Sequence, residues 1–530
     1  MTTTVRDAAF EVMRGCGLDR IFANPGSTEI SFLTDLPEDL AFVLALHEGS
    51  VVGMATGYAL ATGRPAFVNL HTTAGLGNAV GAIATARENR APLVVVVGQQ
   101  DRRHLALEPF LAGKLEGLCG DYPVWTCQPV RAQDVPGAIR RAHHEAAQHS
   151  GPAIVFVPMD DWSAEFDGDL GTGVPTSVVR TGTDPAAAVD HLLPLLTDAL
   201  APALVVGAGA DSRAGWDALI GLAERLGAPV WQEAFGARAG FPQDHPYFAG
   251  HLPAGRAGLR EALQGHDVVL VVGASAFRQY GYEPGRLVPL GVTVAVLSAD
   301  PTQLHQSAAD VALLGDPATV CAALAARLPE RDVVESWRRP ALSEPEPEPV
   351  DGKLRPEHVF TALAERLPRD AVVVEETPSS RPDLHRLLPA RSPGGFLSAA
   401  MGGLGFALPA AAGLRMGDPS RPVVAVLGDG SSLYAIQGLW SAARYECGAL
   451  FIVLSNGRYA VMDQLAARHG GKPPWPGFGE VSISGLASSL GCKALRINTH
   501  MALLAALDEV IPSLATRTEP LLLEVTVSHD

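Results

Sequence analysis

The chain has 530 residues and a formal net charge of −17 at neutral pH, with 47% hydrophobic and 18% charged residues. This composition excludes an intrinsically disordered chain, which cannot bury enough apolar surface to fold. Lys and Arg form no long run, and phosphate contacts need a basic surface, so we expect no nucleic-acid partner.

The cysteines and the first residues of the sequence indicate the cellular compartment in which the protein is expected. None of the six cysteines belongs to a CxxC pair, so neither a zinc site nor a disulfide framework is indicated. The segment Met1–Phe22 lacks the apolar core of a signal peptide. No run of about 18 uncharged apolar residues could span a bilayer. We therefore expect a cytoplasmic protein without membrane association.

Short runs rich in Val, Ile and Leu alternate with longer, helix-prone segments along the chain. The runs are almost wholly apolar, which is typical of parallel strands that helices cover on both faces. We therefore expect an α/β protein with three doubly wound domains and mainly parallel sheets. The clearest runs are Pro65–His71, Pro92–Gly98, Ala153–Pro158, Ala203–Gly207, Asp267–Gly273, Val292–Leu297, Ala371–Glu375, Pro422–Leu427, Ala449–Leu454 and Pro520–Val527.

Two segments interrupt this alternation and divide the chain. Residues 161–184 are rich in Asp, Gly and Thr, and residues 343–356 contain a Glu-Pro repeat that is typical of an extended linker. We therefore expect domains at residues 1–165, 183–335 and 352–530, each close to the usual domain size.

Three polar segments follow short apolar runs in the first domain. They contain Ser27 (in Asn-Pro-Gly-Ser-Thr), Glu48, and His71 at the head of a Thr- and Gly-rich stretch. Polar residues at the carboxyl ends of parallel strands gather at one sheet edge, where α/β sites form. Glu48 lies among apolar residues, where a buried acid can share a proton near neutral pH. The alternative for Glu48 is an acid of a first helical turn, favoured by the helix dipole.

Two other features favour a structural role over a functional one. Gly207-Ala-Gly209 follows an apolar run in the second domain, as in dinucleotide-binding turns. It lacks the third glycine and a well-placed acidic partner, so an ordinary strand-to-helix turn is the favoured interpretation. His104 follows two arginines, and we expect it on the surface.

In the third domain a buried strand ends in Gly428-Asp429-Gly430 and leads into a helix-prone segment, Leu433–Tyr445. Glycines let the backbone approach a phosphate, and a helix start offers free N–H groups. Asp429 supplies the hard oxygen that Mg²⁺ or Ca²⁺ prefers. Asn456 ends the next apolar run, one strand–helix–strand unit later, so we expect it beside Asp429.

These motifs resemble those of the thiamine diphosphate (ThDP)-dependent enzymes, and most closely the benzoylformate decarboxylases. The resemblance rests on the Gly-Asp-Gly…Asn pattern, on Glu48, and on Met401–Pro409. It runs through the whole chain, with the motifs in the same order and spacing. The family usually has a second Asn before the ligand Asn, where this chain has Ser455.

The resemblance implies cofactor-binding roles. Glu48 would activate the pyrimidine ring of ThDP, the backbone of Gly402 would accept from its amino group, and Leu404 would support its bent shape. Asp429, Asn456 and the carbonyl of Arg458 would hold the metal, Mg²⁺ or Ca²⁺. The remaining residues expected at the diphosphate end are Ser379, Gly428, Gly430, Ser431 and Tyr459.

The resemblance also implies that Ser27 binds the substrate carboxylate and that His71 orients the substrate and relays protons. The alternatives are a turn serine that caps the next helix and a strand-end histidine satisfied by the backbone. A second active-site histidine of the family is replaced by Tyr280. Tyrosine has an unperturbed pKa of ~10 against ~6.5 for histidine, so it is a poorer proton shuttle. A packing role for Tyr280 is an equal alternative.

The substrate is expected to be an aromatic or branched 2-oxo acid, because an apolar wall suits such a side chain. The positions that would line this wall could equally be core residues of a helix. The favoured function is decarboxylation to an aldehyde and CO₂. The alternatives are a ThDP-dependent carboligase resembling acetolactate synthase and a non-catalytic ThDP-binding scaffold. The wall positions are Phe110, Leu111, Val461, Met462 and Leu465.

Glu48 and Asp429 lie in different expected domains. The resemblance implies a homodimer or homotetramer in which Glu48 of one chain faces Asp429 of another.

Overall fold

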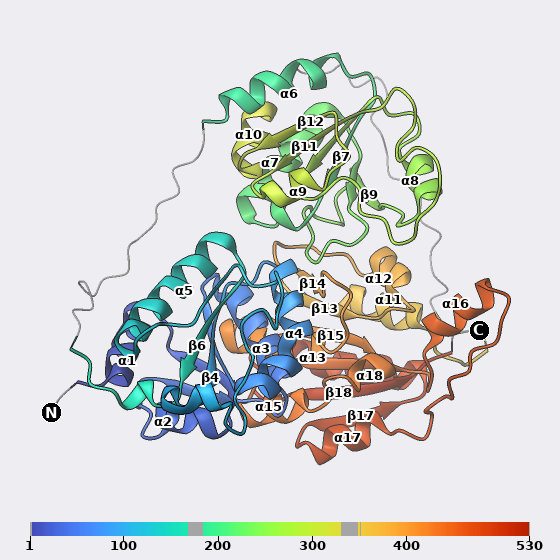
Figure 1. Ribbon diagram of the computed structural model, residues 1–530. Helices are drawn as coiled ribbons and strands as arrows, with labels where there is room; N and C mark the ends of the chain where they lie inside the picture. The colour runs from blue at the N-terminus through green and yellow to red at the C-terminus, as the bar shows by residue number, and fades with distance from the viewer. Residues whose placement is uncertain (1–2, 168–183, 330–347, 350, 529–530) are drawn as a thin grey trace.

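The computed structural model describes residues 3–167, 184–329, 348–349 and 351–528, which form three parallel sheets of six strands each (Figure 1). The N-terminal sheet with its helices lies at lower left in Figure 1, the middle one at the top and the C-terminal one at lower right. This arrangement confirms the expected α/β class with three doubly wound parts.

The first and third sheets share one topology. Their strand orders are β2-β1-β3-β4-β6-β5 and β14-β13-β15-β16-β18-β17. In each, the chain reverses direction across the sheet between the first and third strands, which leaves a crevice at their carboxyl ends. The first sheet has β1 (Arg20–Asn24), β2 (Ala41–Leu44), β3 (Ala66–Leu70), β4 (Leu93–Gln99), β5 (Trp125–Cys127) and β6 (Pro152–Pro158). Its helices are α1 (Val5–Gly15), α2 (Ile30–Leu33), α3 (Glu48–Thr62), α4 (Thr72–Glu88) and α5 (Val135–His149).

The third sheet holds the motifs of the expected diphosphate end. Its central strands β13, β15, β16 and β18 are buried almost throughout, as their apolar runs predict. Its strands are β13 (Val372–Glu376), β14 (Phe396–Ser398), β15 (Val423–Gly428), β16 (Leu450–Ser455), β17 (Lys493–Ile497) and β18 (Leu521–Thr526). Its helices are α11 (Pro356–Arg366), α12 (Arg381–Leu387), α13 (Ala407–Gly417), α14 (Asp429–Ser432), α15 (Gly438–Arg444), α16 (Ala460–Arg468), α17 (Ile483–Ser489) and α18 (His500–Val510).

The middle sheet has a different order, β12-β11-β10-β7-β8-β9, so its chain reversal lies between β7 and β10. Its strands are β7 (Pro202–Val206), β8 (Val230–Gln232), β9 (Phe248–His251), β10 (Val268–Val272), β11 (Thr293–Ser298) and β12 (Val311–Leu314). Its helices are α6 (Ala186–Asp198), α7 (Arg213–Leu226), α8 (Arg256–Ala262), α9 (Pro301–His305) and α10 (Pro317–Arg327).

Each apolar run named in the sequence falls on a strand, but one expected helix is wrong. The segment Leu433–Tyr445 is not a single helix: α14 begins at Asp429 and ends at Ser432, and α15 begins only at Gly438. Turns fill the residues between them. Most of the two expected linkers lies outside the described residues, so the domain boundaries stay predictions.

Helices α3 and α13 join the first and third parts. A Cβ atom on Gly57 would collide with the backbone of Ala410, and one on Gly413 would collide with the backbone of Met54. Only glycine permits such a close approach of two helix backbones. Because α3 begins at Glu48, this contact fixes the position of that residue relative to the third sheet.

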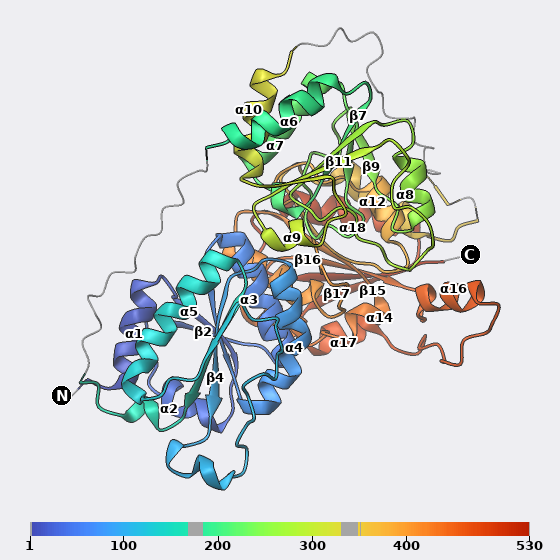
Figure 2. The ribbon, with the colours of Figure 1, turned by 45° about the horizontal axis from the view of Figure 1, so that its top comes forward.

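The middle part rests on the third sheet (Figure 2). The rings of His251 on β9 and His385 on α12 stack with centroids 3.7 Å apart. The N–H of Gly394 donates to the carboxylate of Asp211 at 2.8 Å. These contacts anchor the middle part on α12 and on the loop that leads into β14.

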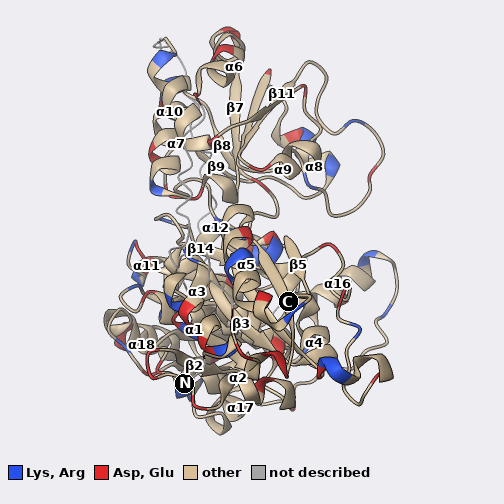
Figure 3. Ribbon diagram, turned by 60° about the vertical axis from the view of Figure 1, so that its left-hand side comes forward, with Lys and Arg blue, Asp and Glu red and all other residues tan. Residues whose placement is uncertain are grey.

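Charged residues lie mostly on helices and loops (Figure 3). Three buried carboxylates interrupt this pattern on strands of the third sheet: Glu375 and Glu376 end β13, and Glu524 lies on β18. Among the described residues, no helix is long and apolar enough to cross a bilayer.

Candidate active site

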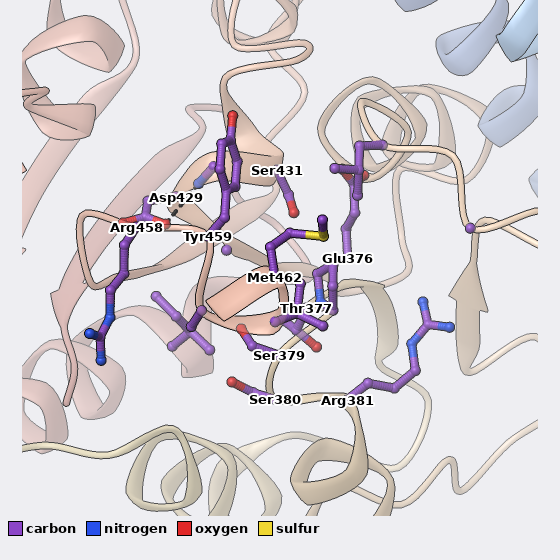
Figure 4. Close-up of a pocket in the computed structure, with 18 of the residues that line it drawn as sticks. Glu376, Thr377, Ser379, Ser380, Arg381, Asp429, Ser431, Arg458, Tyr459 and Met462 are labelled. Carbon is purple, nitrogen blue, oxygen red and sulfur yellow. Dashed lines mark hydrogen bonds between the residues drawn. The ribbon is translucent and has the colours of Figure 1, made fainter. Parts of the chain in front are cut away.

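A cavity of about 760 Å³ opens at the carboxyl edge of the third sheet, at the crevice between β13 and β15. It brings together most of the predicted cofactor and metal residues with part of the predicted substrate wall (Figure 4). The predicted residues that line it are Tyr280, Ser379, Gly402, Leu404, Gly428, Asp429, Gly430, Ser431, Asn456, Arg458, Tyr459, Val461, Met462 and Leu465.

Asp429 is held rigidly in this cavity. Its carboxylate accepts from the N–H of Gly430 at 2.7 Å, of Asn456 at 2.8 Å and of Gly457 at 2.6 Å. Asp429 is 4% exposed. The Asn456 side chain turns back to accept from the N–H of Arg458 at 3.0 Å. The spacing of Asp429 and Asn456 along the chain therefore predicted their meeting correctly.

The residues present fit a diphosphate and a divalent cation. A Cβ atom on Gly430 would lie 2.6 Å from the ring of Tyr459, so this position needs glycine for its close backbone approach. Ser431 follows, is itself buried and lines the cavity. Among the described residues no group of three or more His, Cys, Asp or Glu side chains could hold a metal. The predicted ligand set instead combines one carboxylate, one amide and one backbone carbonyl, all hard oxygen donors.

Glu376 lines the same cavity, and the sequence assigned it no role. Its carboxylate accepts from the N–H groups of Gly405 at 2.7 Å, Phe406 at 2.9 Å and Ala407 at 2.7 Å. Burial raises the pKa of Glu376 to about 7, against the opposing effect of these three donors. The signal available in the sequence was a pair of acids, Glu375 and Glu376, at the end of a wholly apolar strand.

Glu48 is the first residue of α3 and is 8% exposed. Its two oxygens accept separately from the side-chain amides of Asn24 at 3.1 Å and Asn78 at 3.0 Å. The first-turn position expected by the helix-dipole interpretation is therefore present. The two asparagines, which come from the end of β1 and from α4, orient the acid more specifically than a dipole would.

His71 is oriented by side chains rather than by the backbone. Its Nδ1 lies 3.0 Å from Glu29 and 2.9 Å from the Thr28 hydroxyl. Glu29 is 1% exposed and also accepts from the N–H of Gly26 at 2.8 Å. Because Nδ1 is engaged, Nε2 is the ring nitrogen left for other contacts. The sequence did not single out Glu29.

Ser27 begins a short 3₁₀ helix that ends at Glu29 and is exposed. The N-cap position of that helix is Gly26, so the capping interpretation of Ser27 fails. Ser27 lies at the strand-end crevice of the first sheet, and its neighbour Gly26 lies close to the ring of His71, which directly follows β3.

The single chain leaves the predicted residues in two groups. Ser27, Glu48 and His71 belong to the first sheet and do not line the cavity of the third. Phe110 and Leu111 are 89% and 37% exposed, on a loop of the first part, and also lie outside the cavity lining.

The remaining sequence predictions concern Tyr280 and the Gly207–Gly209 turn of the middle part and His104 of the first part. Tyr280 lines the cavity yet is 78% exposed. Gly209 donates to the carbonyl of Gly273 at 2.8 Å, and a Cβ on it would lie 2.8 Å from that glycine's Cα atom. The Gly207–Gly209 turn thus packs against the neighbouring strand end, which favours the structural interpretation. His104 is exposed, as expected.

Comparisons with known proteins place each part of the chain. Residues 3–118 match the N-terminal TPP binding domain of thiamine pyrophosphate enzymes, residues 189–324 the central domain and residues 379–525 the C-terminal TPP binding domain. Thiamine pyrophosphate is another name for ThDP. Benzoylformate decarboxylase from Pseudomonas aeruginosa is 38% identical, over 98% of both chains.

Solved structures agree with these matches. The ThDP-dependent 4-hydroxybenzoylformate decarboxylase of Rhodococcus jostii RHA1 superimposes with a TM-score of 0.94 at 34% identity over the whole of both chains. Benzoylformate decarboxylase from Polynucleobacter necessarius gives a TM-score of 0.93 at 33% identity, over 99% of both chains. Acetolactate synthases are more distant, such as the isozyme 3 large subunit from Escherichia coli at 28% identity over 84% of this chain and 81% of its own. The chain therefore belongs to the thiamine diphosphate-dependent enzymes and is a homologue of benzoylformate decarboxylase.

Proposed function

We propose that this protein decarboxylates an aromatic or branched 2-oxo acid to an aldehyde and CO₂. The observation that carries the proposal is the cavity in which Asp429, Asn456 and the glycine turn meet, in a chain homologous to benzoylformate decarboxylase. Bound ThDP would supply an electron sink for the bond that breaks when CO₂ leaves.

Asp429, Asn456 and the Arg458 carbonyl are proposed to hold Mg²⁺ or Ca²⁺ against the diphosphate. Asp429 supports this role because three backbone N–H groups fix its carboxylate before any ligand arrives. Ser431, Gly428 and Gly430 would contact the phosphates, with Ser379 and Tyr459 nearby. Gly402 and Leu404 would hold the bent cofactor.

The first part of the chain is proposed to supply the proton-handling groups. Glu48 holds a proton at a ring nitrogen of the pyrimidine, in a position set by Asn24 and Asn78. Ser27 binds the substrate carboxylate. Because Glu29 accepts from the Nδ1–H of His71, Nε2 of the neutral ring is an acceptor that can take up a proton and return it to the substrate from the doubly protonated ring. Positioned acid–base groups of this kind contribute ~10²–10⁴ in rate.

Apolar side chains are proposed to select the substrate. Val461, Met462 and Leu465 line the cavity from α16, and Figure 4 shows Met462 among the side chains around it. An aromatic ring fits such a wall better than a charged chain does. Phe110 and Leu111 would complete the wall from a second chain.

The site is proposed to form between two copies of the chain, in a homodimer or homotetramer. The separation of the Glu48 group from the Asp429 cavity supports this assembly. So does the loop around Phe110, where Leu107 is also 82% exposed, since exposed apolar residues of this size mark interaction surfaces.

Complementation tests the shared site. In a twofold dimer of Glu48→Gln with Asp429→Ala chains, one site carries both changes and the other carries none. Co-expression of the two inactive variants should therefore restore about a quarter of the wild-type activity, since half of the dimers are mixed. No recovery in a verified mixed dimer would contradict a site between chains.

Carboligation is the second candidate function, favoured by Tyr280 at the cavity wall where the family has a histidine. A weaker proton donor leaves more time for a second carbonyl compound to react. The test is a panel of aromatic, branched and short 2-oxo acids with purified protein, ThDP and Mg²⁺. Measured together, CO₂ and aldehyde in equal amounts support decarboxylation, acyloin supports carboligation, and no CO₂ from any acid refutes both.

A cytoplasmic location is part of the proposal. All six cysteines are free thiols in the structure, and four of them are buried. Unpaired buried thiols suit a reducing compartment.

A further inference from the structure

Helix α13 begins without a local cap. Its N-cap residue is Phe406, which has no side-chain acceptor, and no side-chain cap hydrogen bond forms there. The first N–H groups of a helix have no partner within the helix, and burying them unpaired is costly. Phe406 and Ala407 are 5% and 0% exposed, so water cannot satisfy these groups freely.

Glu376 supplies the missing acceptor from another strand. One oxygen accepts from Gly405 and the other from both Phe406 and Ala407. The carboxylate is 3% exposed at the end of β13. In its ionised form, which the three N–H donors favour, Glu376 accepts stronger hydrogen bonds than a neutral group would, and its negative charge is favoured at a helix start.

The segment that precedes α13 needs an external restraint. Gly402 and Gly405 have φ angles of +70° and +90°, so the backbone here is built from residues with wide conformational freedom. At its other end, Asn89 of the first part accepts from the N–H of Ala400 at 2.8 Å and donates to the carbonyl of Ser398 at 2.8 Å. The segment is thus held at both ends, by Asn89 and by Glu376, and it spans Gly402 and Leu404.

We propose that Glu376 is a positioning residue that fixes the Gly402–Leu404 backbone in the conformation that receives the cofactor. Glu376 touches the segment rather than the reacting atoms. The inference rests on the proposed roles of Gly402 and Leu404. It assigns Glu376 a function in cofactor affinity that is separate from the stability of α13.

The test is Glu376→Gln, which retains one carbonyl oxygen but loses the second acceptor and the charge. In the cofactor-free protein, amide hydrogen exchange at Gly405, Phe406 and Ala407 should accelerate about tenfold. The Kd for ThDP in the presence of Mg²⁺, measured by calorimetry, should rise about tenfold. At saturating ThDP, kcat should stay within about threefold, because Glu376 does not contact the reacting atoms.

Glu524→Gln is the matched control. Glu524 is 1% exposed on β18 of the same sheet and accepts from the N–H of Ser484 at 2.8 Å, away from α13. It should leave the exchange of the three amides and the Kd unchanged. If both variants weaken ThDP binding equally, the effect is general destabilisation and the proposal is overturned.

A second variant removes the hydrogen bond between Glu376 and Ala407 by changing its donor, Ala407. Ala407→Pro removes one N–H at the first position of a helix, where proline is favoured. Because proline disfavours the αR backbone of the preceding Phe406, the thermal unfolding transition of the variant is measured first to establish that it folds. The Kd should again rise, by a smaller factor than in Glu376→Gln. Faster exchange with an unchanged Kd for ThDP in both variants would overturn the proposal. The hydrogen bonds of Glu376 would then stabilise helix α13 alone. Neither readout needs a substrate, so a protein that binds ThDP but decarboxylates nothing would refute the proposed function and not this inference.

Discussion

The two halves of the proposed site differ in how complete they are within one chain. The diphosphate half has its own cavity at the edge of the third sheet, with Asp429 fixed by three N–H donors. The pyrimidine half has well-oriented groups, since Glu48 is held by two asparagines and His71 by Glu29. Those groups do not line that cavity and lie in the part whose Phe110 loop is exposed.

The two sheets that carry these halves have the same topology, so the difference does not come from the fold. The difference between the two halves comes from the segments that follow the carboxyl ends of the strands. In the third sheet a glycine turn and an oxygen-rich cluster form a concave binding site, whereas in the first sheet Glu48, Glu29 and His71 are largely buried and lie outside that cavity. We therefore expect binding to depend mainly on the third sheet and turnover mainly on the first.

The largest effect is expected for Asp429→Ala. Loss of the fixed carboxylate removes a metal ligand and leaves three N–H groups, buried or half-buried, without an acceptor. Metal-dependent ThDP affinity in a calorimetric titration should fall at least about hundredfold. Asp463→Ala is the control: Asp463 accepts from the indole of Trp475 at 3.0 Å near the same cavity but is outside the predicted ligand set. An affinity equal to wild type in Asp429→Ala would refute the metal site.

Glu48→Gln should separate binding from turnover. The amide keeps the shape and one acceptor for Asn24 or Asn78 but cannot hold the proton. We expect ThDP to bind within about threefold of the wild-type Kd while kcat falls about hundredfold or more. Steady-state assays at saturating ThDP measure this split. A variant with normal kcat would contradict the assignment of Glu48 to the pyrimidine.

Tyr280→His tests whether the weak proton shuttle limits the rate. Histidine titrates nearer to neutral pH than tyrosine, so aldehyde release should speed up about tenfold if protonation is slow. Tyr282→His is the matched control, since Tyr282 is 86% exposed and lies outside the cavity lining. An unchanged or lower rate in Tyr280→His would favour the packing interpretation of Tyr280.

A change in stability, with no expected effect on activity near neutral pH, concerns how firmly the middle part is anchored on the diphosphate half. Burial, together with the charge of Arg381, lowers the pKa of His385 to about 3. The unfolded chain takes up a proton below its pKa of ~6.5 while the folded chain stays neutral. Stability is therefore full above that pH and is lost as the pH falls, by about 1.4 kcal/mol for each pH unit well below ~6.5.

Chemical unfolding at several pH values measures this loss. In His385→Phe the aromatic stack on His251 can persist without a titrating group, so this part of the pH dependence should disappear. The same slope in both proteins would show that His385 is not the group responsible.

The sequence predicted the central strands because each is a wholly apolar run, as both faces of such a strand are buried. It did not predict the edge strands. β5, β12 and β17 are short or half-exposed, and their mixed residues carry no clear period. The expected helix after Gly430 was wrong in its bounds, because helix-forming composition does not locate the turns at residues 433–437.

For the site, the sequence by itself determined that Asp429 and Asn456 would meet, because strand ends one unit apart in a parallel sheet reach the same edge. Only the tertiary structure decided that Glu376 holds the backbone 31 residues later and that Glu29 orients a histidine 42 residues later. The physical reason is that hydrogen-bond partners depend on the reach and packing of individual side chains once the strands are paired. The pattern of apolar runs specifies which edges meet, but it contains no information on which donor faces which acceptor there.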